Sequence, residues 1–336
     1  MRFTKFLSLI LTICILFTLS ACGQKDLPPD ETSSTVAQEV KSLNRLTGEA
    51  LEKESDKNIR PVAVMINNIS VAQKVQSGVT YADIVFETEV EGGITRMMAV
   101  FSDISKVEGD IGPVRSARVV FPHIAMGIGA VYIHAGSDTD YCTPEMERLA
   151  TNRIDINNKA QYSFRKKNGL STEHTMFTTA DLLVQGVKDH KFEEVKKTEP
   201  FANFAKDGEI ITPATGTALN LKVPFSSGYV TKFTYNSETG KYDKKKPSGS
   251  CSESYNNVFV LKTPMSHYPS GKERKIDLNG GSGYYISNGA YEEIKWSKGN
   301  ANDAFTFTKA DGSTLTVNTG SSYVCILKDS ADPSFS

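Results

Sequence analysis

The segment YADIVFETEVEGGITRMMAVF, residues 81–101, decides the fold of this chain. Two β-rich runs flank Gly92-Gly93, and consecutive glycines permit the positive φ angles of a two-residue hairpin turn. Such a turn places Glu89 opposite Arg96, and the other cross-strand pairs follow from that register. One face of the hairpin is then expected to be core, and it carries Ile84, Phe86, Val90, Met97, Ala99 and Phe101.

The opposite face of the hairpin gathers three carboxylates. Glu87, Glu89 and Glu91 occur at every second residue, so an extended strand presents them on one side. Partial burial makes each unpaired charge costly. The sequence therefore predicts cationic partners for this face, and Arg96 is the first of them.

Further arginines follow in GPVRSAR, residues 112–118. Gly112-Pro113 predicts a helix start, and helical spacing places Arg115 and Arg118 on one side of that helix. One hypothesis is that these arginines pair with the strand carboxylates. The other is that they bind a phosphate or carboxylate at the helix start, where free N–H groups favour an anion. The candidate binding residues are Arg96, Arg115, Ser116, Arg118, Glu87 and Glu89.

A catalytic alternative rests on His134. This residue ends an apolar strand, and strand ends in α/β sheets often border ligand crevices. With Glu87 or Asp138 it could serve as a general acid or base; otherwise it is bonded to nearby backbone or carboxylate. The sequence has no H-E-x-x-H, nucleophile elbow, phosphate-binding glycine motif or EF-hand loop, so it predicts neither a metal site nor a cofactor.

The pattern along the chain predicts two domains. Strands alternate with helices over residues 59–205, which indicates an α+β or α/β N-terminal domain. Residues 210–329 carry short β-like runs separated by turn signals such as Asn236–Gly240 and Asp311-Gly312, which indicates a smaller, mainly-β C-terminal domain. Three cysteines, Cys142, Cys251 and Cys325, are expected to be small buried hydrophobes, with a Cys251–Cys325 disulfide left open.

The N-terminus predicts a lipid anchor. A basic start and an apolar run too short to span a bilayer comfortably lead to Leu19-Ser-Ala-Cys22, which resembles a bacterial lipobox. Residues 1–21 are expected to be a lipoprotein signal peptide, and Cys22 to carry the lipid that holds the protein at a membrane. Residues 22–58 are expected to be the anchor and tether. The alternatives are an ordinary secretory signal or an N-terminal membrane helix.

Composition narrows the range of partners. The chain is 39% hydrophobic and 23% charged, with a formal net charge of −1. No basic stripe is present to bind nucleic acid, so nucleic acid is not an expected partner. Proteins, small ligands and cell-wall polymers remain. In the C-terminal half, aromatic residues could stack on sugars, form an interface or pack in the core. They are Tyr235, Tyr242, Tyr255, Tyr268, Tyr284, Tyr285, Tyr291 and Trp296.

Besides the hairpin and GPVRSAR (112–118), the chain carries RPVAVMINN (60–68) and GYYISNG (283–289). Together these motifs resemble the YerB-like lipoprotein family. The resemblance implies a surface lipoprotein of Gram-positive bacteria, with N- and C-terminal domains of unknown function and no accepted catalytic residues.

Together these features predict a membrane-anchored, extracytoplasmic lipoprotein. It is expected to be a binding or scaffold protein of the cell envelope that recognises a partner protein or an anionic wall component, and not an enzyme. The alternative is a hydrolase or transferase acting on cell-wall material, with His134 and a carboxylate in catalysis and the arginines holding the substrate.

Overall fold

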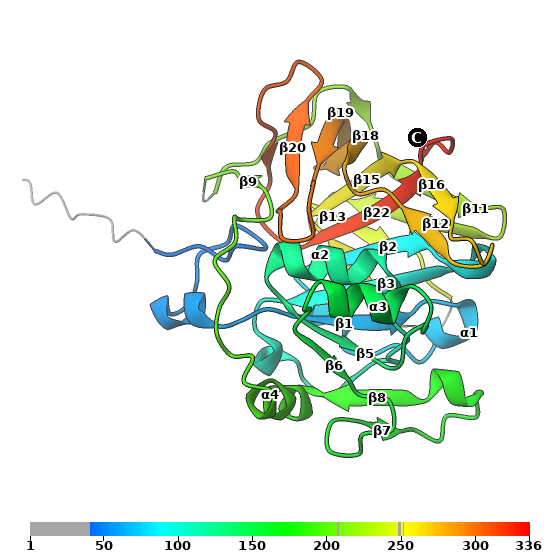
Figure 1. Ribbon diagram of the computed structural model, residues 1–336. Coiled ribbons are helices and arrows are strands. Elements are labelled where there is room, and N and C mark those ends of the chain that lie inside the picture. The colour runs from blue at the N-terminus through cyan, green and yellow to red at the C-terminus, as the bar shows by residue number, and fades with distance from the viewer. Residues whose placement is uncertain (1–40, 207, 248–249, 251) are drawn as a thin grey trace, which may run out of the picture. The chain divides into compact units, whose positions relative to one another are not determined.

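A mixed β-sheet runs through both halves of the chain, and its strands lie side by side down Figure 1. The computed structural model describes residues 41–336 except 207, 248–249 and 251. The predicted signal peptide and Cys22 lie outside the described residues, as does Cys251. Across the described residues the sheet has eleven strands, with β20 (Thr306–Lys309) pairing with β19 at one end. The order of the other ten is β10 (Gly216–Thr217), β19 (Ala290–Ser297), β18 (Gly280–Ser287), β15 (Asn257–Thr263), β22 (Ser322–Lys328), β2 (Ile84–Glu89), β3 (Thr95–Phe101), β1 (Val62–Asn67), β5 (Val131–His134) and β6 (Arg153–Asp155).

Strand β22 joins the two halves of the sheet. It pairs in parallel with β2 on one side and with β15 on the other. The N-terminal half mixes helices with strands and the C-terminal half is mainly strands, which confirms the predicted fold class. The sequence did not predict that a C-terminal strand would complete the sheet of the N-terminal half.

The central hairpin has a different register from the predicted one. Val90 N donates to Ile94 O at 2.8 Å, so the loop has three residues, Glu91–Gly93, with φ of 67° and 72° at its two glycines. The predicted pairing of Glu89 with Arg96 is therefore wrong, because Glu89 faces Thr95. A shift of one residue moves a strand's side chains to the opposite face.

Both faces of the hairpin are buried, so the expectation that only one face belongs to the core is also wrong. Ile84 and Phe86 pack in one core, whereas Met97 and Ala99 pack in the other. The first core lies under α2 (Val120–Ile128) and α3 (Cys142–Arg148), which lie over the sheet in Figure 1. The second core contains side chains of α4 (Ala180–Asp189) and of a five-stranded sheet. That sheet has the order β14 (Glu253–Tyr255), β13 (Lys241–Lys244), β12 (Tyr229–Asn236), β11 (Asn220–Ser226) and β23 (Ser334–Phe335).

The segment 112–118 is extended and does not begin a helix. Arg115 N donates to Met65 O, and Ala135 N donates to Arg115 O, both at 3.0 Å. The segment thus lies between the ends of β1 and β5, and α2 begins only at Val120. The remaining short elements are α1 (Ser70–Gln73), β4 (Asp110–Ile111), β7 (Phe164–Arg165), β8 (Met176–Thr179), β9 (Asn203–Phe204), β16 (Met265–His267), β17 (Arg274–Ile276) and β21 (Thr316–Val317), together with five 3₁₀ turns at Glu54–Asn58, Val79–Tyr81, Glu91–Gly93, Ile104–Lys106 and Thr172–His174.

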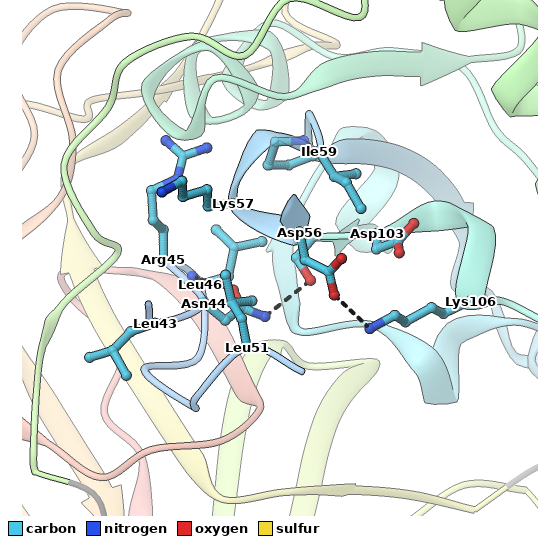
Figure 2. Close-up of a pocket in the computed structure, with 12 residues that line it drawn as sticks. Leu43, Asn44, Arg45, Leu46, Leu51, Asp56, Lys57, Ile59, Asp103 and Lys106 are labelled. Atoms are coloured by element: carbon cyan, nitrogen blue, oxygen red, sulfur yellow. Dashed lines mark hydrogen bonds and ion pairs between the residues drawn. The ribbon is translucent and has the colours of Figure 1, made fainter. Parts of the chain in front are cut away.

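Residues 41–58, expected to belong to the tether, pack onto the folded body instead. Leu46 is buried, Asn44 Nδ2 donates to Ser102 Oγ at 3.0 Å, and Lys106 Nζ lies 3.7 Å from a carboxylate oxygen of Asp56 (Figure 2). The hollow in Figure 2 measures about 60 Å³, which is room for roughly two water molecules. We therefore do not consider it a ligand site.

Two of the three cysteines lie among the described residues, and both are buried free thiols, Cys142 and Cys325. Burial, followed by the charge of Asp138, raises the pKa of the Cys142 thiol to about 12.

Among the described helices, none combines the length and the apolar character that crossing a membrane requires.

Candidate functional site: an arginine cluster at the carboxyl edge of the sheet

Three parallel strands end at the same edge of the sheet. β1, β5 and β6 pair in parallel, so their last residues, Asn67, His134 and Asp155, share one side. β3 is antiparallel to β1 and brings Arg96 to this edge opposite Asn67. Ligands of α/β sheets commonly bind outside the carboxyl ends of the strands.

Glu91, in the hairpin loop, holds two arginines. Arg96 Nη2 lies 3.1 Å from Glu91 Oε1. Arg118 donates from Nε to Glu91 Oε2 at 2.7 Å and from Nη2 to Oε1. Arg96 is further fixed by donating to Ser116 O at 2.8 Å. Two guanidinium groups share one carboxylate, so the cluster carries one surplus positive charge.

Burial distinguishes the two arginines. Only 2% of the Arg96 side chain is exposed, against 18% of Arg118. Burial, with the nearby charge of Arg118, lowers the pKa of Arg96 to about 9, so this guanidinium still carries its charge at neutral pH. Burial alone would raise the pKa of Glu91, but hydrogen bonding from Arg118 and the charges of both arginines outweigh it and lower that pKa to about 2.

Arg115 extends the cluster with a second ion pair. Its Nη2 lies 2.7 Å from Glu173 Oε2. The next residue, His174, is buried, and its Nδ1 lies 2.8 Å from Nδ2 of Asn67. We call Glu91, Arg96, Arg115, Arg118 and Glu173 the arginine edge.

The structure thus separates the predicted candidate residues. Arg96, Arg115, Arg118 and the backbone of Ser116 come together at the arginine edge. Glu89 instead pairs with Arg274 of β17, whose Nε donates to it at 3.2 Å. Glu87 is fully buried in the sheet and accepts hydrogen bonds from Asn68, Thr95, Thr231 and Tyr323.

Two participants were missed in the sequence. Glu91 follows Glu87 and Glu89 at the spacing of a strand, but it belongs to the loop Glu91–Gly93, so the alternating pattern did not identify it as a binding residue. Glu173 lies 58 positions from Arg115, and no local pattern links the two.

His134 does not form an acid–base pair with either predicted carboxylate. Its Nδ1 donates to Gly136 O at 2.9 Å, and burial lowers its pKa, so the ring is neutral at pH 7. Its Nε2 is buried without a hydrogen-bond partner in the described part of the chain. Asp138 instead accepts hydrogen bonds from the backbone at the start of α3, from Tyr141 N at 2.7 Å and from Cys142 N at 3.1 Å. In residues 41–336, leaving out the four that are not described, no cluster of acidic, His and Cys side chains is arranged to hold a metal ion.

The Glu91 pKa leads to a prediction about acid stability. A carboxylate whose pKa falls from 4.5 to about 2 on folding stabilises the protein above pH 4.5, and this contribution is lost as the pH falls through 2. Glu91→Gln should therefore lower the free energy of unfolding at pH 7 by about 1–2 kcal/mol after allowance for solvent screening. Urea unfolding at pH 7 and pH 2 measures it. The deficit should largely disappear at pH 2, where the folded carboxylate is about half protonated. An equal deficit at both pH values would contradict the prediction, and the exposed Glu238→Gln is the control.

Comparisons with known proteins agree on one family. Residues 46–193 match the domain described as "Protein of unknown function (DUF3048) N-terminal domain", and residues 221–324 match "Protein of unknown function (DUF3048) C-terminal domain". The chain is 26% identical over 337 residues, covering 95% of both chains, to a Bacillus subtilis (strain 168) protein named "Putative lipoprotein YerB". A crystal structure of YerB protein from Bacillus subtilis superposes with a TM-score of 0.74 at 24% identity, covering 88% of this chain and 100% of the other, which shows a shared fold.

Proposed function

This chain belongs to the DUF3048 protein family, and from that premise we propose that it is a lipid-anchored binding protein of the cell envelope. Its ligand is an anionic group, phosphate or carboxylate, carried by a wall polymer or a partner protein. The arginine edge is the recognition site. No catalytic step is part of the proposal.

Two observations support the anchored location. The lipobox-like Leu19-Ser-Ala-Cys22 provides a thiol for lipid attachment, and the relative that spans 95% of this chain is named a lipoprotein. Diacylglycerol on Cys22, with a further N-acyl chain, would hold the domain at the outer face of the membrane, because two or more chains anchor far better than one.

The surplus positive charge at the arginine edge carries the proposal. Arg96 is buried against Glu91 and orients it, whereas Arg115 and Arg118 keep 23% and 18% of their side chains exposed. Guanidinium groups bind carboxylate and phosphate oxygens through paired, charge-assisted hydrogen bonds. An anion at this edge would meet two partly exposed arginines.

The test is direct binding by the full mature lipoprotein in detergent micelles. Titration with purified teichoic acid, and separately with an acidic peptide, distinguishes the two sources of the anionic group. Arg118→Ala should weaken binding at least tenfold, since a hydrogen bond to a charged group contributes about 1.5–3 kcal/mol, and added salt should weaken it further.

Controls separate this site from general electrostatics. The exposed Lys232→Ala removes the same charge elsewhere and should leave the dissociation constant unchanged. Unchanged affinity in both Arg115→Ala and Arg118→Ala would reject the site, and absence of binding to either probe would reject the anionic ligand.

A further inference from the structure

A second candidate site lies between α2 and the hairpin formed by β16 and β17. An open cavity of about 560 Å³ is bordered by the start of α2, by α3 and by this hairpin. Its volume falls in the range of small-ligand sites, about 300–1,000 Å³. Apolar side chains form part of its wall: Val119, Val120, Met265, Ile276 and Leu278.

Hydrogen-bond acceptors form another part of the wall. Glu145 accepts from His123 Nε2 at 2.7 Å and receives two bonds of 2.7 Å from Arg148. A carboxylate offers about four acceptor positions, so Glu145 retains one. Burial lowers the pKa of His123, and its Nε2 must carry the proton donated to Glu145. In the neutral ring Nδ1 is a second acceptor, and Asp277 adds a further carboxylate to the lining.

Tyr268 gives the cavity an aromatic wall that is held in place. Its ring stacks on Tyr141 at 4.4 Å between centroids, with planes 22° apart. Tyr141 Oη in turn accepts a hydrogen bond from Ser270 N at 3.1 Å, which ties the hairpin loop to the start of α3. Burial raises the pKa of Tyr268, so its hydroxyl remains a donor at neutral pH.

The charges around the cavity favour an uncharged ligand. Glu145 is neutralised by Arg148, and the lining places Lys275 together with Asp277. These four charges sum to zero, so the cavity favours neither an anion nor a cation. A ligand with an apolar face and several hydroxyl donors matches both the aromatic wall and the acceptors.

We propose that this cavity binds a neutral oligosaccharide, with one sugar ring stacked on Tyr268 and hydroxyl groups donating to Glu145 and Asp277. This site lies outside the arginine edge and takes a ligand of different charge. The inference does not rest on the proposed function and can stand or fail separately.

The test titrates the full mature lipoprotein in detergent with three tetrasaccharides. Two are neutral, the β-1,4-linked tetramers of N-acetylglucosamine and of glucose, and the third is a carboxylated hyaluronan tetramer. At least one neutral probe should bind with a dissociation constant below about 10 mM. Tyr268→Ala should weaken that binding at least tenfold, while Tyr268→Phe, which keeps the ring, stays within about threefold.

Two controls test whether a loss of binding comes from the cavity itself and not from unfolding or from losing any tyrosine. Tyr81→Ala removes an exposed tyrosine elsewhere and should leave affinity unchanged, and urea midpoints confirm that each variant is folded. If Tyr268→Ala is unstable, Glu145→Gln supplies the second variant and should also weaken binding. Failure of both neutral probes to bind, tighter binding of the carboxylated one, or equal affinity in folded Tyr268→Ala would each overturn the proposal.

Discussion

Replacing Glu87 with leucine is expected to lower the free energy of unfolding by about 3–5 kcal/mol. Glu87 lies in β2 with no exposed surface. Leucine fills similar space but accepts no hydrogen bond, so four buried donors lose this acceptor. Asn68 Nδ2 keeps its bond to Thr95 Oγ1 at 2.8 Å and Tyr323 Oη keeps Met97 Sδ at 3.5 Å, and each group left unsatisfied costs about 1–3 kcal/mol. The donors are Asn68 Nδ2 at 2.7 Å, Thr95 Oγ1 at 2.6 Å, Thr231 Oγ1 at 2.8 Å and Tyr323 Oη at 2.6 Å.

These four donors make the expected loss global. Asn68 and Thr95 belong to the N-terminal half, whereas Thr231 and Tyr323 belong to β12 and β22 of the C-terminal half. Glu87 therefore joins the central sheet to the sheet that covers it. Disrupting this contact should weaken both halves together, and the whole body should still unfold in one transition.

Urea unfolding followed by circular dichroism and by tyrosine fluorescence measures this effect. Glu87→Gln retains the shape and one acceptor oxygen, so we expect a smaller loss of about 1–2 kcal/mol. Glu238→Leu, at an exposed turn, controls for removing an acidic residue. A loss below about 1 kcal/mol for Glu87→Leu would show that the buried network contributes little.

The sequence predicted the elements of the sheet more accurately than their pairing. The β-rich runs around Gly92-Gly93 do form β2 and β3. The register was wrong because the loop includes Glu91 and both glycines, whereas two adjacent glycines also suit a two-residue turn. Since both faces are buried, the side-chain pattern alone could not reveal the shift.

The arginine site was predicted in composition but not in geometry. Arginines were expected to meet the hairpin carboxylates, and Arg96 and Arg118 do meet Glu91. Pro113 was interpreted as the start of a helix, but proline also fits extended segments, and the backbone of 112–118 bonds to β1 and to the residues after β5. The ion pairs of Arg118 with Glu91 and of Arg115 with Glu173 join residues 27 and 58 positions apart. Both depend on that tertiary arrangement.

The position of β22 could not be inferred from local patterns. Residues 322–328 are apolar enough to indicate a buried strand, yet nothing in their sequence specifies β2 as a neighbour 238 positions away, where Thr88 Oγ1 donates to Ile326 O at 2.9 Å. Long-range parallel pairing is set by the whole fold. The central sheet therefore continues across the predicted domain boundary near residue 210.

Because a C-terminal strand completes the central sheet, we expect that the N-terminal half does not fold alone. A chain that ends at residue 210 lacks β22, so the edge of β2 loses its parallel partner along Ile84–Thr88. The shortened chain also exposes an apolar strand edge, which promotes aggregation. It lacks Thr231 and Tyr323, two of the four donors to Glu87. We expect such a chain to be insoluble, or soluble without a cooperative unfolding transition.

A chain that ends at Asp329 provides the matched comparison. It keeps β22 but loses β23, whose Phe335 stacks on Tyr291 at 4.0 Å between centroids, and the ion pair of Asp332 with Lys262. Losing these partly buried contacts at the edge of the sheet should cost about 1–2 kcal/mol and leave unfolding cooperative. Circular dichroism, urea unfolding and amide NMR dispersion distinguish the two chains. Cooperative unfolding of the chain ending at residue 210 would mean that β22 adds to a sheet already stable without it, and that Glu87 needs only Asn68 and Thr95 to remain buried.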